Sequence, residues 1–297
     1  MSDTKVMMSK DMQKVSVQQR IIGICAKTLT YTFLSIMAII VIFPFYWMII
    51  SSLKTLTEYR MAIPTMFPKY MDWKNYIEVF TNEDLLLGQL FGNTLYVGIV
   101  STILSLVITV LSAFAFARLE FKGKNALFGF LLATMMIPGE LFTITNYQTV
   151  NAFGWMETFT VLIVPFLVSV FYIYLLRQNF LQIPNELYLA AKVDGTTDLK
   201  YLWKVMIPLS LPNLISITIL KMMGAWNSYM WPRLVANDDA HKLITNGLRT
   251  AFTDASGNTD IPVQMAAVAV VSLPLFLVFV FLRKYIMKGV SRSGIKG

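Results

Sequence analysis

Six long apolar stretches, separated by shorter polar segments, dominate the pattern of residues along this chain. A helix needs about 20 mostly apolar residues to cross ~30 Å of hydrocarbon. Because lipid offers the backbone no hydrogen-bond partners, a helix is the one reasonable structure for such a run. The pattern therefore predicts an all-α membrane protein with six transmembrane helices. The expected spans are about 29–51, 92–117, 126–147, 158–178, 210–231 and 263–285.

The third stretch differs from the others because Pro138-Gly139-Glu140 interrupts it. A proline inside a helix removes a backbone donor and bends the helix. We expect one kinked span here rather than two short ones.

The composition supports a polytopic membrane protein. Of the 297 residues, 56% are apolar and only 14% are charged, whereas a soluble domain has about 45–50% apolar and about 25% charged residues. The single cysteine, Cys25, excludes an intrachain disulfide and a cysteine-rich metal site. The first apolar stretch is too long for a signal-peptide core, and we expect it to be retained.

The net charge of +8 is distributed unevenly, and this distribution predicts the sidedness of the chain. Seventeen Lys and Arg residues lie in the N-terminal tail, the 118–125 turn, the 177–208 loop and the C-terminal tail, against seven in the other connecting segments. Since cytoplasmic loops carry the excess of Lys and Arg, both termini and the 179–209 loop are expected in the cytoplasm. The positive charge thus needs no nucleic-acid partner. The expected division is a tail over 1–28, a six-helix domain over 29–285 and a tail over 286–297.

Residues 183–212 form a polar, helix-capable segment between the fourth and fifth spans. Pro184 suits the first turn of a helix, and Gly195 can adopt the left-handed conformation that ends one. Four residues between them share one side of the helix at i, i+3, i+4 and i+7 spacing: Leu187, Ala190, Ala191 and Asp194. The two small alanines would let a docking partner approach closely. An ordinary interfacial helix has the same pattern, so this segment alone leaves both interpretations open.

Motifs elsewhere in the chain favour the docking interpretation. In chain order they are Pro44-Phe45-Tyr46-Trp47, Ala113-Phe114-Ala115-Phe116-Ala117-Arg118, Leu175-Leu176-Arg177-Gln178, Trp203 with Pro208 and Pro212, and Trp226-Asn227-x-Tyr229. Over nearly its whole length the chain thereby resembles the MalG-type carbohydrate permeases of binding-protein-dependent ABC importers. It departs from them at Leu189, where the family usually carries an acidic residue, and at Thr196, where the family carries a smaller one.

This resemblance implies the fold of a type I ABC importer permease and a function in carbohydrate uptake, with an oligosaccharide as the expected solute. Such permeases work by alternating access, driven by ATP on separate subunits. The 183–212 segment would contain the coupling helix, which docks in a groove of an ATPase subunit. The expected coupling residues are Glu186, Leu187, Ala190, Ala191, Asp194 and Gly195.

The resemblance also implies partners and a location. The partners would be a second, homologous permease, two ATP-binding cassette ATPase subunits, an extracellular solute-binding protein, the carbohydrate and the lipid of a bacterial-type cell membrane. ATP and Mg²⁺ would bind the partner ATPase, so this chain is expected to hold no cofactor or metal and to catalyse no reaction. The sequence has no Gly-x-x-x-x-Gly-Lys-Ser/Thr phosphate loop, as that role requires.

Two charged residues, Glu140 and Lys221, fall within the spans and away from their ends. Intramembrane charges are costly and usually face the bundle interior or a cavity. We hypothesise that both face the translocation pathway or the subunit interface, as a pair across it. In the alternative interpretation, Lys221 snorkels to the interface and backbone groups freed at Pro138 satisfy Glu140.

Two further candidate sites lie toward the outside. At the end of the fifth span an aromatic surface with one amide suits a sugar, although aromatic residues there are also typical bilayer anchors. These residues are Trp226, Asn227 and Tyr229. The outside loop 233–262 matches in position the loop with which the resembled permeases contact the binding protein. The candidate contacts in it are Ser256, Gly257 and Asn258.

Other functions compete with carbohydrate import. An importer for glycerol phosphate, a polyamine or an amino acid would belong to the same broad class. A secondary transporter usually shows repeated halves and several buried carboxylates, whereas this chain shows one intramembrane Glu and no visible repeat. An intramembrane enzyme needs a nucleophile–base pair or a metal site, and the sole histidine, His241, lies in an outside loop without evident companions.

Overall fold

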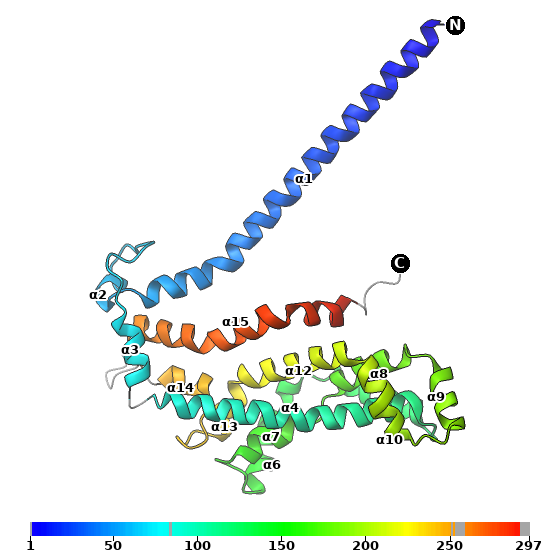
Figure 1. Ribbon diagram of the computed structural model, residues 1–297. Coiled ribbons are helices and arrows are strands. Elements are labelled where there is room, and N and C mark those ends of the chain that lie inside the picture. Colours follow the sequence, from blue (N-terminus) through cyan, green and yellow to red (C-terminus); the bar gives the residue numbers. More distant parts are fainter. Residues whose placement is uncertain (1, 83–84, 251, 253–258, 292–297) are drawn as a thin grey trace.

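The computed structural model describes residues 2–82, 85–250, 252 and 259–291, and the elements in these residues are helices (Figure 1). The first helix, α1 (Ser2–Ser52), extends away from the other helices as a long arm. Its C-terminal part packs on α15 (Ile261–Ser291). Next to α15 lies α12 (Leu211–Trp226), which packs in turn against α4 (Leu87–Arg118).

Three helices in the described part of the chain are long and apolar enough to cross a membrane by themselves: Gly23–Ser52 within α1, α4, and Ile261–Arg283 within α15. Three helix pairs, each bent at a short break, bring the number to six if each pair is one span. The first pair joins α5 (Lys124–Thr134) to η1 (Gly139–Phe142) and α6 (Thr143–Ala152), with a bend of 82°. The second joins α7 (Phe159–Ile163) and η2 (Val164–Phe166) to α8 (Val170–Leu181), with a bend of 45°. The third joins α10 (Asp198–Tyr201), η3 (Leu202–Met206) and α11 (Ile207–Leu209) to α12, with a bend of 82°.

Each of the six expected stretches overlaps one of these candidates. The third is broken where Pro138-Gly139-Glu140 interrupts the sequence, because α5 ends at Thr134 and η1 begins at Gly139. The fourth is also broken, between η2 and α8, which the apolar pattern did not indicate. The fifth helix ends at Trp226 rather than near 231, and a separate short helix, α13 (Met230–Val235), follows it.

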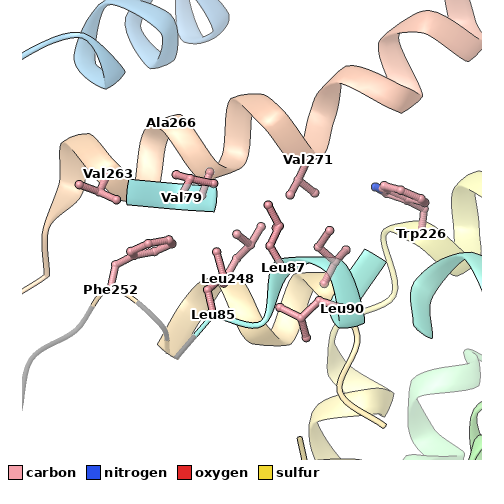
Figure 2. Packing of buried hydrophobic residues seen from close by; sticks show 12 residues of the cluster. Val79, Leu85, Leu87, Leu90, Trp226, Leu248, Phe252, Val263, Ala266 and Val271 are labelled. Atoms are coloured by element: carbon pink, nitrogen blue, oxygen red, sulfur yellow. The ribbon is translucent and has the colours of Figure 1, made fainter. Parts of the chain in front are cut away.

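Two of the buried apolar clusters are formed by helices at opposite ends of the bundle, whose positions Figure 1 shows. At one end, α3 (Lys74–Thr81), the start of α4, α14 (Ile244–Thr250) and α15 enclose one apolar cluster (Figure 2). Around the end of α4, the second core contains residues of α8, α10, η3 and α12. Two further helices are short. Helix α2 (Leu56–Tyr59) follows α1 in the sequence, and α9 (Asn185–Val193) lies beside the second core.

Small side chains let α4 and α12 approach each other closely. A Cβ atom built on Gly98 of α4 would lie 2.8 Å from the sulfur of Met222 in α12, which is closer than side chains normally allow. Ser101, Ser105 and Thr109 continue this buried small-residue surface of α4 toward the second core. Small residues are typical of helix interfaces in membranes, where van der Waals contact rather than the hydrophobic effect drives association.

The end of α4 near α3 is fastened to the segment before α14. Asn93 Nδ2 donates to the carbonyls of Ala240 and Lys242, at 2.9 and 3.0 Å. Thr94 Oγ1 accepts a hydrogen bond from the backbone N–H of Ile244 at 2.9 Å. Because these polar groups are buried and paired, they hold the loop at a defined position on α4.

Candidate functional site

The segment between α8 and α12 is helical and lies at the end of the bundle farthest from α3 (Figure 1). Helix α9 begins after Pro184 and ends before Gly195. Gly195 has a φ of +69°, so the predicted left-handed end of this helix is confirmed. The last turn is closed by backbone hydrogen bonds from Asp194 N to Ala190 O (3.0 Å) and from Thr196 N to Ala191 O (2.8 Å).

A single carboxylate ties α9 to α10. Asp198 Oδ1 accepts hydrogen bonds from Tyr188 Oη at 2.8 Å and from Lys192 Nζ at 2.7 Å. The hydrogen bond with Asp198 raises the pKa of the Lys192 ammonium. The Tyr188 ring also packs against the buried Tyr201 ring, with their centroids 5.1 Å apart. These contacts make α9 and α10 one folded unit.

Arg118, the last residue of α4, fastens the start of α9 to the bundle. Its side chain is buried, and Nη2 donates to the carbonyls of Phe180 at 2.9 Å and Ile183 at 2.5 Å. Nη1 donates to the side chain of Asn185, the first residue of α9, at 3.4 Å. Arg177 of α8 donates in return to a backbone carbonyl of α4, at 3.0 Å. Charge-assisted hydrogen bonds of this kind are stronger than neutral ones, so α4, α8 and α9 are held together at this end.

The outer surface of α9 is exposed and partly apolar. Of the six predicted coupling residues, the structure leaves five exposed and half-buries Ala191, which packs against the second core. Exposure is high at Leu189 (56%) and Val193 (89%), two residues one turn apart that the sequence analysis did not select as coupling residues. Their i, i+4 spacing was the signal that could have identified them. An exposed apolar surface of this kind is typical of a protein-binding site.

Lys221 of α12 lies in the wall of a cavity of about 400 Å³, where Lys221 Nζ donates to the carbonyl of Phe166 at 2.5 Å. Glu140, in contrast, is exposed in η1 and does not line this cavity. Among the described residues, the ion pairs do not include one between Glu140 and Lys221. A pair across a subunit interface therefore remains a prediction, and the structure places only Lys221 at a cavity of this chain.

The aromatic residues predicted at the end of the fifth span lie in different environments. Trp226 is buried in the first apolar cluster, with 4% of its surface exposed (Figure 2). Its ring contacts that of Phe91, with 5.6 Å between the two centroids. This packing corrects the expectation of an open aromatic surface at Trp226, because core residues from α4 and α15 cover the ring. Asn227 is exposed, and Tyr229 Oη accepts a hydrogen bond from Arg233 at 2.7 Å.

Two predictions concern the loop over 233–262. The candidate contacts with a binding protein, Ser256, Gly257 and Asn258, lie outside the described residues. His241 has companions that the sequence analysis did not identify: Nδ1 lies 2.7 Å from Asp238 Oδ2, and the ring packs edge-on against Phe159 at 4.7 Å. The contact with Phe159 holds the loop against α7, so the role of His241 in this structure is packing.

Comparisons with known proteins agree with this arrangement. A family model described as "Binding-protein-dependent transport system inner membrane component" matches residues 105–292. The chain is 32% identical over 262 residues to the arabinooligosaccharides transport system permease protein AraQ of Halalkalibacterium halodurans, covering 88% of this chain and 93% of that protein. It is 30% identical over 258 residues to the sn-glycerol-3-phosphate transport system permease protein UgpE of Rhizobium meliloti, covering 84% and 91%.

A solved structure shares the fold. A chain of a bacterial ABC transporter involved in the import of the acidic polysaccharide alginate matches with a TM-score of 0.79 and 22% sequence identity, over 90% of this chain and 96% of that chain. The expected permease fold is therefore confirmed at the level of the helix arrangement.

Proposed function

Because this chain belongs to the family of binding-protein-dependent transport system inner membrane components, we propose that it is the membrane subunit of an ATP-driven importer that carries a carbohydrate, in the form of an oligosaccharide. The family makes it an integral membrane permease. The similarity to AraQ, whose name specifies arabinooligosaccharides, supports an oligosaccharide as the solute.

The observation that carries the proposal is α9, an exposed helix fastened by Arg118 and Asp198 to three other helices. In this mechanism an ATPase subunit docks on the outer surface of α9 and its closure moves the bundle between outward-open and inward-open states. The chain itself catalyses no reaction, and ATP with Mg²⁺ binds the ATPase. A second, homologous permease, two ATPase subunits and an extracellular solute-binding protein complete the transporter.

Glycerol phosphate is the second candidate solute, because the relative UgpE is nearly as similar to this chain as AraQ is. The two candidates share the same mechanism and the same coupling helix. They differ only in the group that the translocation pathway must accept.

The test is ATP-driven uptake by the complete transporter in proteoliposomes, with a labelled arabino-oligosaccharide and with glycerol phosphate. The informative variant is Val193→Asp, which places a charge on the most exposed apolar residue of α9. The matched control is Lys122→Asp, which introduces the same side chain at an exposed turn away from α9 that is also expected on the cytoplasmic side. We expect Val193→Asp to lower both uptake and solute-stimulated ATP hydrolysis at least about tenfold, as for an interface hot spot, and the control to change neither.

Uptake without ATP, or uptake that Val193→Asp leaves unchanged, would contradict the proposal. Uptake of glycerol phosphate but of no oligosaccharide would replace the solute and keep the coupling mechanism.

A further inference from the structure

The fourth candidate span is broken, and the break leaves two backbone carbonyls without their usual helical donors. Pro165 has no N–H group, so it cannot donate to the carbonyl of Val161 four residues earlier. The carbonyl of Phe166 lies at the end of η2. Each carbonyl accepts from a distant side chain instead: Trp231 Nε1 donates to Val161 at 3.0 Å, and Lys221 Nζ donates to Phe166 at 2.5 Å.

The cavity beside this break lies between α4, η2, α8, α12 and α13. Its volume of about 400 Å³ is in the range of small-molecule sites. The aromatic rings of Phe166 and Trp231 line it, and so do four residues with hydroxyl groups: Ser101, Ser169, Tyr172 and Ser228. Such a mixture of rings and hydroxyls can stack on a sugar ring and hydrogen-bond its substituents.

The charge of Lys221 is not needed to close the broken helix. Trp231 donates to the Val161 carbonyl through a neutral N–H group. A neutral donor at residue 221 would bind the Phe166 carbonyl in the same way. An ammonium has three donors, and the hydrogen bond to Phe166 uses one of them. A charge within a membrane is costly, and such charges usually face a water-filled cavity or pair with opposite charges or backbone carbonyls.

The charge on the wall of the cavity is positive. Among the described residues that line it, Lys221 is charged and none is acidic. Helix α8 also begins here, with Ser169 as its N-terminal cap, and the N-terminal end of a helix carries partial positive charge. Discontinuous helices of membrane transporters commonly place such ends near the anionic groups of their solutes. The cavity is therefore electropositive on two independent counts.

We propose that this cavity receives an oxyanion of the transported solute, a carboxylate or a phosphate, which pairs with Lys221 while the sugar ring packs on the aromatic wall. The inference rests on the proposed function. It narrows the expected solutes of the importer to acidic carbohydrates or their phosphate-bearing counterparts, rather than neutral carbohydrates. Lys221 is then a specificity-determining residue in addition to its contact with the Phe166 carbonyl.

The experiment compares ATP-driven uptake of three probes by the complete transporter in proteoliposomes: a galacturonate trimer, its neutral methyl ester and glycerol phosphate. Lys221→Gln keeps a donor for the Phe166 carbonyl and removes the charge, whereas Lys221→Arg keeps the charge. Lys122→Gln removes an equal charge from an exposed turn outside the cavity and serves as the control. Because the binding protein is the same in every arm, a change in the ratio of acidic to neutral uptake comes from this chain.

We expect Lys221→Gln to lower that ratio about 10- to 100-fold, as for the loss of a charge-assisted hydrogen bond, while Lys221→Arg and Lys122→Gln largely retain it. A loss confined to the trimer identifies a carboxylate, and a loss confined to glycerol phosphate identifies a phosphate. An equal effect of Lys221→Gln on the trimer and its ester, or wild-type uptake of neutral solutes alone, would overturn the inference. Failure of the wild type to take up these probes or an arabino-oligosaccharide with ATP would instead contradict the proposed function.

Discussion

Arg118 is buried at the end of α4, and its guanidinium donates to two backbone carbonyls that precede α9. Phe180 lies in the last turn of α8, and Ile183 lies between that helix and Pro184. A planar guanidinium can reach several acceptors at fixed angles, which a lysine ammonium cannot do as well. At the scale of a single residue, this side chain determines how the expected coupling helix is joined to the bundle.

The Arg118→Ala variant is expected to lose about 1–3 kcal/mol of stability, because it leaves the carbonyl of buried Ile183 without the donor that Arg118 supplies. Arg118→Lys should recover part of that loss, since it keeps the charge but not the fork of donors. Thermal unfolding of the purified transporter measures the first effect, and the ratio of solute uptake to ATP hydrolysis measures whether coupling is weakened. An unchanged unfolding temperature for Arg118→Ala would show that other contacts hold the turn.

Gly195 offers a second test at this scale. A Cβ atom there would meet no neighbour within 4 Å, so any cost of Gly195→Ala comes from its φ of +69° alone. We expect a loss of about 1–2 kcal/mol. Gly129→Ala is the matched control, because Gly129 lies within α5, also in open space, and there alanine favours the helix by up to about 1 kcal/mol. Equal effects of the two substitutions on thermal unfolding would contradict the role of the left-handed turn.

At the scale of elements, α9 and α10 are joined through Asp198, and its two partners differ in environment. Tyr188 is half-buried and also contacts the Tyr201 ring, whereas the side chain of Lys192 is 46% exposed. Exposed ion pairs contribute little, because water and salt screen them. The hydrogen bond from Tyr188 should therefore hold the two helices together more strongly than the ion pair does.

We expect Tyr188→Phe to raise hydrogen exchange across residues 185–201 severalfold more than Lys192→Met does. Removing the hydroxyl leaves the ring packing in place, so the difference reports the hydrogen bond to Asp198, which is worth about 1 kcal/mol or more. Exchange measured by mass spectrometry on the reconstituted transporter decides between them. If Lys192→Met had the larger effect, and that effect vanished in high salt, the ion pair would be the dominant contact.

Helix α9 also shows how far local sequence patterns reach. Its end at Gly195 and the six apolar stretches follow from neighbours within a few residues, and the resemblance to importer permeases that the motifs suggested is confirmed. The pattern could not show that Ala191 turns inward while Val193 is the most exposed apolar residue of the helix. Which side of a nine-residue helix faces the bundle depends on the contacts of Tyr188 with α10, which lie outside the helix itself.

The same limit explains the differences elsewhere. Trp226 was expected to be accessible, but it is buried by residues around 91 and 271, which are distant in the sequence. The carbonyls freed at the break in the fourth span accept hydrogen bonds from Lys221 and Trp231, also far along the chain. Periodicity reports one helix at a time, so it predicts spans well and cavities between spans poorly.

At the scale of the whole molecule, the three unbroken spans differ in how much this chain covers them. The most apolar part of α4 has 44% of its residues buried, whereas the corresponding parts of α15 and α1 have 17% and 6%. Helix α4 is therefore the centre of the bundle, and the exposed apolar surface of α1 needs lipid or another subunit to cover it.

The sidedness expected from the Lys and Arg distribution is testable on the same scale. In a Cys25→Ser background, we expect Lys122→Cys to react with a membrane-impermeant thiol reagent only after the membrane is opened, and Met61→Cys to react in intact cells. Both residues are exposed in this chain, so accessibility depends on the side of the membrane rather than on burial. Labelling of Lys122→Cys in intact cells would reverse the orientation and place α9 outside the cell.

Helix α4 runs for 32 residues without a break, which is about 48 Å at 1.5 Å per residue. Asn93 and Thr94 bind the segment before α14 near one end, and Arg118 binds the residues just before α9 at the other. A rod held at both tips transfers a push or a twist without any relay of side chains between them. The segments bound at the two ends of α4 would then move together. The variant Ile103→Pro, at an exposed position midway along α4, would break the helix and let each end move independently.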